Sequence, residues 1–279
     1  MTHITNQDIT FIITTFKSEK IINSCIDRLP IESKKIIVEN SSNHSLKNQL
    51  ENRYKNLDCY VIGKNLGYGK ANNLGIEKST TRYIFILNPD AHILENTIQD
   101  MCKNLQNIKF AIAAPYSRDD IKIEAFKDQT IIEQDFIKGF AMLIDKNEIG
   151  NIGFFDENFF LYMEEIDLCK RIKNNGKKMF LIKTEVDHKS GASHGDREDF
   201  EMEKSRNWHW MWSKFYYNKK HYGYFKALIS TFPNFLSSGI KFLFYSLVNN
   251  NKKKKTYLMR YKGLLNSYLM SDAFYRPYE

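Results

Sequence analysis

The stretch Tyr83-Ile84-Phe85-Ile86-Leu87-Asn88-Pro89-Asp90 decides the fold class of this 279-residue chain. A continuous run of apolar and aromatic residues that ends in a polar turn is typical of a strand buried on both faces. Similar runs precede it at Ile9–Thr14, Lys35–Val38 and Cys59–Ile62. Segments with helical periodicity separate these runs. The pattern therefore predicts an α/β fold with a mostly parallel central sheet and helices on both faces.

The remaining elements follow from the same periodicities. Helices are expected at Lys17–Leu29, Gly69–Lys78, Leu94–Leu105 and Glu164–Asn174, and further strands at Ile121–Phe126, Phe136–Ile144 and Met179–Ile182. Ligands of parallel sheets bind beyond the carboxyl ends of the strands. The polar residues at those ends are therefore the first candidates for a site: Thr15, Glu39, Asn88 and Asp90.

The C-terminal part differs from the rest in composition. Residues 204–279 hold 14 basic and 2 acidic residues, against 27 and 31 in residues 1–203. They also hold 20 of the 39 aromatic residues and all three tryptophans. The positive charge is therefore a local feature of the tail. We expect one domain at 1–203, with parts at 1–115 and 116–203, followed by a helical extension at 204–279.

The cysteines and the hydropathy of the chain indicate a cellular compartment. The four cysteines lie far apart and show no metal-ligand spacing, which favours buried thiols in a reducing compartment. The N-terminus lacks the basic and apolar regions of a signal peptide. No stretch reaches the roughly 18 apolar residues that a membrane span needs. We expect a cytoplasmic protein, able to sit on a membrane without crossing it.

Two loops are candidates for binding phosphate. In Asn88-Pro89-Asp90, an acidic group directly after a buried strand can meet a divalent cation, although the same residues also form ordinary turns. In Asn65–Gly75, glycines before a helix let the backbone approach a phosphate, although a helix-capping turn has the same composition. The second stretch fits neither a dinucleotide-binding nor a Walker motif.

Two further stretches carry titratable groups. Glu164, Glu165 and Asp167 lie among aromatic residues, where burial would raise the pKa of a carboxyl and suit it to act as a general base. The alternative is a solvated acidic helix start. His188 follows the last expected strand and is either a metal ligand or an exposed loop residue.

Taken in order, these patterns resemble the inverting family-2 glycosyltransferases, in particular the bacterial rhamnosyltransferase-like branch that builds cell-surface polysaccharide. The resemblance covers residues 9–195. The stretches that carry it are Phe11–Ser18, Val38–Ser42, Asn65–Ile76, Leu87–Asp90, Gly139, Gly153–Glu157, Phe160–Cys169, and His188 with Gly191-Ala192-Ser193.

The resemblance implies a GT-A fold, a nucleotide-binding α/β sandwich, with nucleotide-sugar bound by residues 1–115. Thr15 and Glu39 match positions that contact the base and ribose, with Glu39 standing where Asp is usual. Asn72 and Asn73 match positions near the diphosphate. Asn88 stands in the Asp-x-Asp motif as the substitution typical of this branch.

Asp90 and His188 match ligands of Mg²⁺ or Mn²⁺, and Glu165 falls on the catalytic base, which is normally Asp. Asp167 and Glu164 are the alternative bases. The implied reaction moves L-rhamnose from dTDP-L-rhamnose, or a hexose from a UDP-sugar, to a lipid-linked saccharide. That chemistry belongs to O-antigen or capsule synthesis at the inner face of the cell membrane.

Other interpretations remain open from the sequence. The basic aromatic tail also suits a nucleic-acid-binding protein, although no nucleic-acid motif occurs in it. The substitutions at 39 and 165 also suit an inactive relative that only binds nucleotide-sugar. We expect residues 204–279 to dock on an anionic membrane surface, with Trp208, Trp210, Trp212 and Lys252–Lys255 at the edges of broken apolar segments. The alternative for this tail is packing on the catalytic domain or a homodimer interface.

Overall fold

The computed structural model describes residues 4–117, 123–188 and 200–276. Its contacts divide the chain into two compact units. The first, called here the α/β unit, comprises Met1–Leu66, Lys70–Phe155 and Leu168–Arg197. The second, called the helical unit, comprises Gly67–Gly69, Asp156–Asp167 and Glu198–Glu279.

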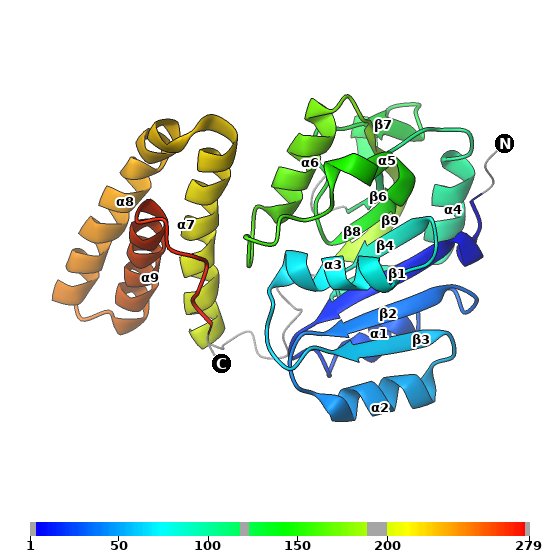
Figure 1. The fold of residues 1–279 in the computed structure, drawn as a ribbon, viewed down its shortest axis with the longest axis horizontal. Coiled ribbons are helices and arrows are strands. Elements are labelled where there is room, and N and C mark those ends of the chain that lie inside the picture. The colour runs from blue at the N-terminus through cyan, green and yellow to red at the C-terminus, as the bar shows by residue number, and fades with distance from the viewer. Residues whose placement is uncertain (1–3, 118–122, 189–199, 277–279) are drawn as a thin grey trace. The chain divides into compact units, whose positions relative to one another are not determined.

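A nine-stranded sheet forms the centre of the α/β unit (Figure 1), in the order β3-β2-β1-β4-β8-β6-β9-β5 with β7 also paired to β9. The strands are β1 (Ile9–Thr15), β2 (Lys34–Glu39), β3 (Leu57–Val61), β4 (Tyr83–Leu87), β5 (Ala91–Ile93), β6 (Ile112–Tyr116), β7 (Ile131–Glu133), β8 (Ala141–Asp145) and β9 (Met179–His188). Strands β3, β2, β1 and β4 are parallel neighbours, whereas β8 runs antiparallel to both β4 and β6. The expected α/β fold with parallel strands at its centre is confirmed.

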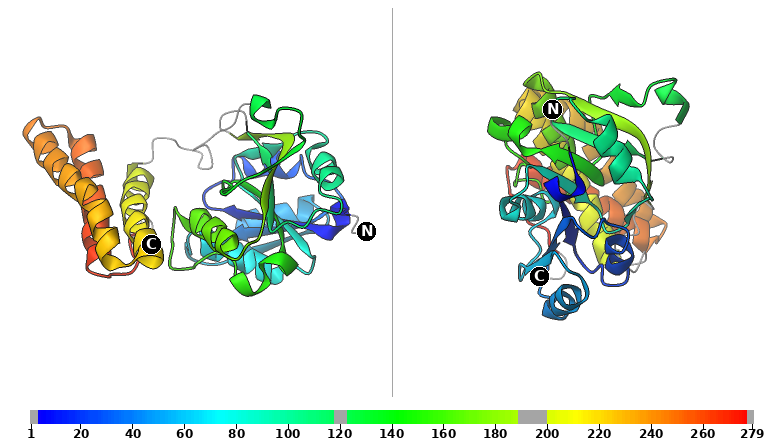
Figure 2. Two further views of the ribbon diagram at one scale, coloured as in Figure 1. Left: turned by 90° about the horizontal axis from the view of Figure 1, so that it is seen from above. Right: turned by 90° about the vertical axis from the view of Figure 1, so that its right-hand side faces the viewer.

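Helices connect the strands and cover the sheet (Figures 1 and 2). They are α1 (Ile22–Ile26), α2 (His44–Arg53), α3 (Tyr68–Lys78), α4 (Thr97–Asn104), α5 (Lys146–Ile149) and α6 (Glu164–Asn174), with short 3-10 turns at Asn6–Asp8, Ile123–Phe126 and Gly150–Ile152. Helix α3 lies so close to the sheet that a Cβ on Gly75 would come within 2.5 Å of the Ile12 side chain. Only glycine fits at that position without a shift of the helix.

Four expected elements differ from the structure. The strand expected over Phe136–Ile144 is shorter and begins only at Ala141, as β8. Ile123–Phe126 is a 3-10 turn, so the strand expected at Ile121–Phe126 is wrong over its described residues. The helix expected over Lys17–Leu29 shrinks to α1, because Lys17 adopts a left-handed φ of 54°. The side chain of Ser18 also bonds the Phe16 backbone, which makes a turn there. The last strand is longer than expected and runs on to His188.

Three helices make up most of the helical unit, as expected for the C-terminal extension: α7 (Phe200–Tyr222), α8 (Tyr224–Leu247) and α9 (Asn251–Tyr268). Helix α9 packs against both α7 and α8, and α8 also contacts α7 near their junction (Figure 2). Gly223 joins α7 to α8 with a φ of 87° that favours glycine. The side chain of Asn250 accepts a hydrogen bond from the Lys253 backbone and begins α9.

Aromatic side chains of α7 fill the core of this unit. Trp208 and Trp212 are buried against Phe160 and Ala273. The α7–α9 contact is close, since a Cβ on Gly263 would lie 2.3 Å from the Trp208 carbonyl oxygen. The expectation that the tryptophans lie at a membrane edge is therefore wrong for Trp208 and Trp212. Trp210 alone of the three is exposed.

Helix α8 continues through Pro233 and Gly239, where the sequence suggested that the apolar segment breaks. The helix accommodates Pro233 at an exposed position, although proline removes one backbone hydrogen bond. Within the described residues, no helix combines the length and the hydropathy needed to cross a membrane.

Candidate functional site

Thr15 and Glu39 lie side by side at the carboxyl ends of β1 and β2, where the strand register pairs them. The Thr15 hydroxyl donates a hydrogen bond of 2.6 Å to one carboxyl oxygen of Glu39, and the Ser41 hydroxyl donates to the other. Burial raises the pKa of Glu39, and the hydrogen bonds from Ser41 and Thr15 oppose that rise. The structure thus brings together the two residues expected at the nucleotide, and Ser41 steadies the longer carboxylate.

Asn40 is a residue that the sequence analysis missed. Its amide donates to the Asn65 side chain at 2.9 Å, and its carbonyl oxygen accepts from the Leu66 backbone at 2.8 Å. These bonds tie the turn after β2 to the start of the glycine-containing loop before α3. An asparagine directly after an expected strand was the available signal, because asparagine often bonds nearby backbone in turns.

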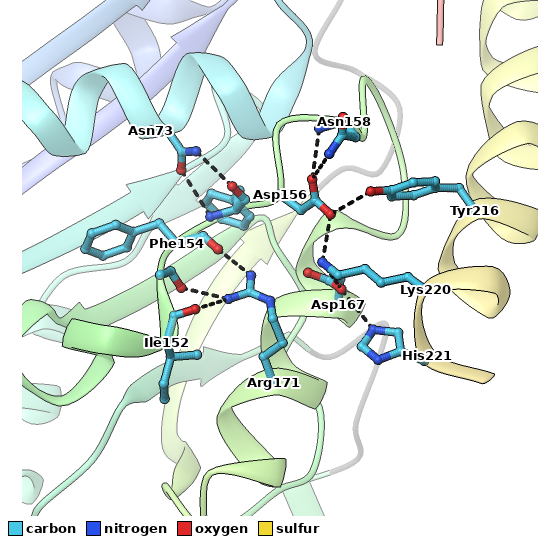
Figure 3. A network of polar contacts seen from close by, with 12 residues as sticks. Asn73, Ile152, Phe154, Asp156, Asn158, Asp167, Arg171, Tyr216, Lys220 and His221 are labelled. Atoms are coloured by element: carbon cyan, nitrogen blue, oxygen red, sulfur yellow. Dashed lines mark hydrogen bonds and ion pairs between the residues drawn. The ribbon is translucent and has the colours of Figure 1, made fainter. Parts of the chain in front are cut away.

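The two asparagines of α3 have different partners. The Asn72 side chain is buried and accepts a hydrogen bond of 3.1 Å from Thr14. The Asn73 amide donates to the Phe155 carbonyl at 2.9 Å, and its oxygen accepts from the Phe155 N–H at 3.1 Å (Figure 3). Asn73 therefore holds the backbone of the Gly153–Phe155 turn through both amide atoms.

Asp90 and His188 meet because β5 pairs antiparallel with β9, which sets Ala91 opposite His188. One carboxyl oxygen of Asp90 lies 3.7 Å from Nε2 of His188. The imidazole stacks on the ring of Phe140, with centroids 4.0 Å apart and planes 10° from parallel. Both side chains are nearly buried, so their orientations are fixed by packing. Gly191-Ala192-Ser193, expected next to this histidine, lie outside the described residues.

This pair fits a divalent cation of the Mg²⁺ or Mn²⁺ type. Asp90 offers a carboxylate oxygen and His188 an imidazole nitrogen from neighbouring strand ends. The side-chain oxygen of Asn88 is buried and accepts no hydrogen bond from the part of the chain that is described. Among those same residues, no group of three or more His, Cys, Asp or Glu could hold a metal. A site with two protein ligands, Asp90 and His188, suits an ion that takes its remaining ligands from phosphate and water.

Phe140, whose ring stacks on His188, also lines a cavity of about 320 Å³. Ala114, Tyr116, Ile137 and Leu181 make its walls mainly apolar, and its polar contributions come from Ser117, Gln134, Asp135 and Lys138. An apolar hollow with a few polar groups is the ordinary form of a small-ligand pocket.

The acidic segment of the helical unit begins with backbone strain. Tyr162 and Met163 have left-handed φ angles of 70° and 72°, which are unfavourable for side chains of this size. Helix α6 starts directly after them at Glu164. Burial raises the pKa of Glu164 well above its ordinary value, and the neighbouring Glu165 adds to the rise. Burial also raises the pKa of Glu165, which is the more exposed of the two.

Asp167, the third carboxylate of this segment, is occupied by α7. Its side chain has no exposed surface, and one oxygen lies 2.7 Å from Nζ of Lys220 and 2.8 Å from Nε2 of His221 (Figure 3). The structure thus separates Asp167 from Glu164 and Glu165, which the sequence left as alternatives.

Lys220 also binds Asp156, at 2.7 Å, so one ammonium group bridges two carboxylates (Figure 3). Burial would raise the pKa of Asp156, but hydrogen bonds from Lys220 and Asn158 outweigh it and lower the pKa below its ordinary value. Tyr216 donates a further hydrogen bond of 3.1 Å to Asp156. Together these contacts fasten both ends of the Asp156–Asp167 segment to α7.

The sheet, the polar residues at its strand ends and the Asp90–His188 pair agree with the glycosyltransferase class that the resemblance implies. The chain belongs to glycosyl transferase family 2, whose model matches residues 10–169. The expected family and the enzyme class, glycosyltransferase, are confirmed. The chain is 26% identical over 191 residues to the low-salt glycan biosynthesis hexosyltransferase Agl10 of Haloferax volcanii. That alignment covers 60% of this chain and 62% of Agl10, so the chain spans less than two thirds of that relative.

A second relative is the rhamnosyltransferase WbbL of Escherichia coli K12, 24% identical over 238 residues that cover 71% of this chain and 88% of WbbL. Among solved structures, the mannosyltransferase PcManGT from Pyrobaculum calidifontis, in complex with GDP-Man and Mn²⁺, has a TM-score of 0.58 at 13% identity. The match covers 93% of this chain and 86% of PcManGT. The likeness confirms the GT-A fold.

Proposed function

We propose that this chain transfers a sugar from a nucleotide-sugar to a saccharide acceptor with inversion at the anomeric carbon. The donor we favour is dTDP-L-rhamnose, with a UDP-hexose as the alternative, because one relative is named a rhamnosyltransferase and another a hexosyltransferase. The acceptor is a lipid-linked saccharide of a surface polysaccharide, such as an O-antigen or capsule. The observation that carries the proposal is the convergence of Asp90 and His188 at 3.7 Å beside the strand ends that carry Thr15 and Glu39.

The donor is held by the α/β unit. Glu39, fixed by Thr15 and Ser41, binds the ribose and base, and Asn72 lies near the diphosphate. Asp90 and His188 would hold Mg²⁺ or Mn²⁺, and the structure of PcManGT is a complex with Mn²⁺. An ion held there would offset negative charge on the departing nucleoside diphosphate. Displacement by a single hydroxyl then gives inversion without a protein nucleophile.

Glu165 removes the proton from the acceptor hydroxyl. Its raised pKa makes it a stronger base than an ordinary carboxylate once it is deprotonated. Burial and the neighbouring Glu165 raise the pKa of Glu164 well above its ordinary value, and among the described residues one of its carboxyl oxygens has no hydrogen-bond partner, so Glu164 is less suited than Glu165 to lose its proton. Asp167 positions the helix start through Lys220 and His221.

The helical unit brings the enzyme to the inner face of an anionic cell membrane, where a lipid-linked acceptor lies. Its surplus of basic residues supports this proposal, since each Lys or Arg near an anionic surface contributes about 1 kcal/mol. The alternative proposal is that the helical unit forms a homodimer interface.

The first experiment tests the metal. Purified protein is supplied with dTDP-L-rhamnose or UDP-hexoses, and release of nucleoside diphosphate is measured with chelator, Mg²⁺ or Mn²⁺. We expect chelation to stop release, added ion to restore it, and Asp90→Asn to lower it at least about a hundredfold. Asp58→Asn, a surface change on β3, is the matched control. Full activity in excess chelator contradicts the proposal.

The second experiment tests the base. Glu165→Gln should abolish transfer and leave donor affinity, measured by calorimetry, within about twofold, because the donor does not use the proton acceptor. In the wild-type protein, transfer should rise with pH through a pKa above the ordinary glutamate value, since the base works deprotonated. Transfer by Glu165→Gln near the wild-type rate, with Glu164→Gln inactive, would reverse the two roles.

A further inference from the structure

One face of α8 is apolar and exposed along its whole length. Its members repeat at intervals of three and four residues, which places them on one side of a helix. They form what we call the α8 stripe: Phe225, Ile229, Phe232, Leu236, Ile240, Leu243 and Leu247. Their exposed fractions run from 47% at Phe232 to 86% at Leu247. At 1.5 Å per residue the stripe is about 33 Å long.

The opposite face of α8 holds the helix in place. Ala227 is buried in a cluster with Met211, Phe215 and Leu264 of α7 and α9. The buried Thr231 hydroxyl lies 3.1 Å from the Tyr268 hydroxyl of α9. The stripe is therefore not part of the core of this unit, and its orientation away from α7 and α9 is set by packing.

Lysines surround the stripe, and α8 contains no acidic residue. Lys226 and Lys241 are exposed on α8 itself. At its C-terminal end, Nζ of Lys253 lies 5.2 Å from the ring of Tyr245, which places the first turn of α9 beside the last turns of α8. Lys253 therefore lies at the C-terminal end of α8, whereas Lys252 pairs with Glu203 and Lys255 lies over the Phe200 ring, both at the start of α7.

We propose that the α8 stripe inserts into the interfacial region of an anionic lipid bilayer, with the axis of α8 parallel to the surface. The stripe supplies the apolar face of an interfacial helix, and the lysines contact lipid phosphates. This inference rests on the proposed function only in that a lipid-linked acceptor gives the docking a purpose. It also assigns the contact to α8 and not to the buried tryptophans of α7.

Charge favours a membrane over a second copy of the chain. Two copies joined through the α8 stripe would bring lysines from both toward one another, with no acidic residue on either α8 to pair with them. Residues 204–279 carry 14 basic and 2 acidic residues, so like charges would oppose that contact. An anionic bilayer offers the complementary charge and accepts a flat apolar face of this length.

The test uses the full chain and vesicles of phosphatidylcholine, with and without phosphatidylglycerol, at low and high salt. Ile229→Glu with Ile240→Glu places two charges in the stripe, at positions exposed enough to keep the fold. Ser230→Glu with Ser237→Glu is the matched control, since it adds the same charge on the exposed polar flank of α8. We expect wild type and control to sediment with anionic vesicles and release at high salt, and the stripe variant to bind at least about tenfold more weakly.

Two results would overturn the inference: no sedimentation under any condition, or equal binding by the stripe variant and wild type. Sedimentation equilibrium completes the test, because a wild-type dimer that the stripe variant abolishes, without vesicle binding, assigns the stripe to a second copy. Nucleoside diphosphate release with a water-soluble acceptor is measured on the same proteins. It reports the proposed function separately, since the stripe variant should keep it.

Discussion

Replacing Lys220 by methionine tests whether the ion pairs of α7 hold the Asp156–Asp167 segment. Methionine keeps the length and the apolar stem of the side chain and removes the ammonium group that contacts Asp156 and Asp167, each at 2.7 Å. Asp167 would then be a fully buried carboxylate that keeps its contact with the His221 ring on α7. The change therefore isolates the charge from the packing.

The magnitude follows from burial. Removing one partner of a fully buried ion pair costs about 3–5 kcal/mol, because the other charge stays desolvated. The Lys220 side chain is 27% exposed and Asp167 has no exposed surface, so water screens one partner and not the other. We therefore expect Lys220→Met to lower the free energy of unfolding by about 2–3 kcal/mol. That is a large part of the 5–15 kcal/mol typical of a folded protein.

Urea denaturation followed by tryptophan fluorescence measures this change, because all three tryptophans lie on α7 and report the helical unit. Lys226→Met, on the exposed start of α8, is the control for loss of one positive charge. Lys220→Arg should keep most of the stability, since it retains the charge. If Lys220→Met and Lys226→Met differ by less than about 0.5 kcal/mol, the ion pairs do not stabilise the segment.

Two further predictions concern the helical unit. Gly263→Ala should lower the free energy of unfolding by about 1–3 kcal/mol, because its Cβ would lie 2.3 Å from the Trp208 carbonyl oxygen. Gly239→Ala is the control: its Cβ would meet nothing closer than 3.5 Å, so the free energy of unfolding should rise by up to about 1 kcal/mol. Equal effects of the two substitutions in urea denaturation would contradict the close contact between α7 and α9. Burial lowers the pKa of His209 from its ordinary value of 6.5 to about 3. Between these values the unfolded state binds a proton at this histidine and the folded state does not, so the free energy of unfolding falls as the pH drops below 6.5. Urea midpoints from pH 7 to pH 4 should show wild type losing about 3 kcal/mol more than His209→Gln, and parallel pH curves would refute this role.

Elements with a complete local signal could be predicted from the sequence. Helix α6 has the bounds Glu164–Asn174 that its acidic first turn and the following glycine indicate. Strand β4 likewise matches Tyr83–Leu87, a run of apolar and aromatic residues that ends in a turn. The strand expected over Ile121–Phe126 failed because a short apolar run does not distinguish a strand from a 3-10 turn.

The candidate site residues could be predicted from the sequence, but the contacts between them could not. Asp90 and His188 come together through β5, a strand of only three residues that no sequence pattern reveals. The lysine that binds Asp167 is 53 positions away on a helix whose partner face could not be read from spacing. The tryptophans of α7 were misplaced for a related reason. An aromatic cluster with nearby lysines suits a core or an interface equally well, and only packing decides between them.

The division of the chain into units has a consequence for engineering. Residues 156–167 carry the proposed base at one end and belong, by their contacts, with the C-terminal helices and not with the sheet that precedes them in sequence. A graft that moved only the C-terminal helices into another family member would leave this loop without the tyrosine and lysine that secure it. Exchange of acceptor preference between relatives should therefore succeed only when the loop and the helices are transplanted together. The two segments are separate in sequence but form one structural unit.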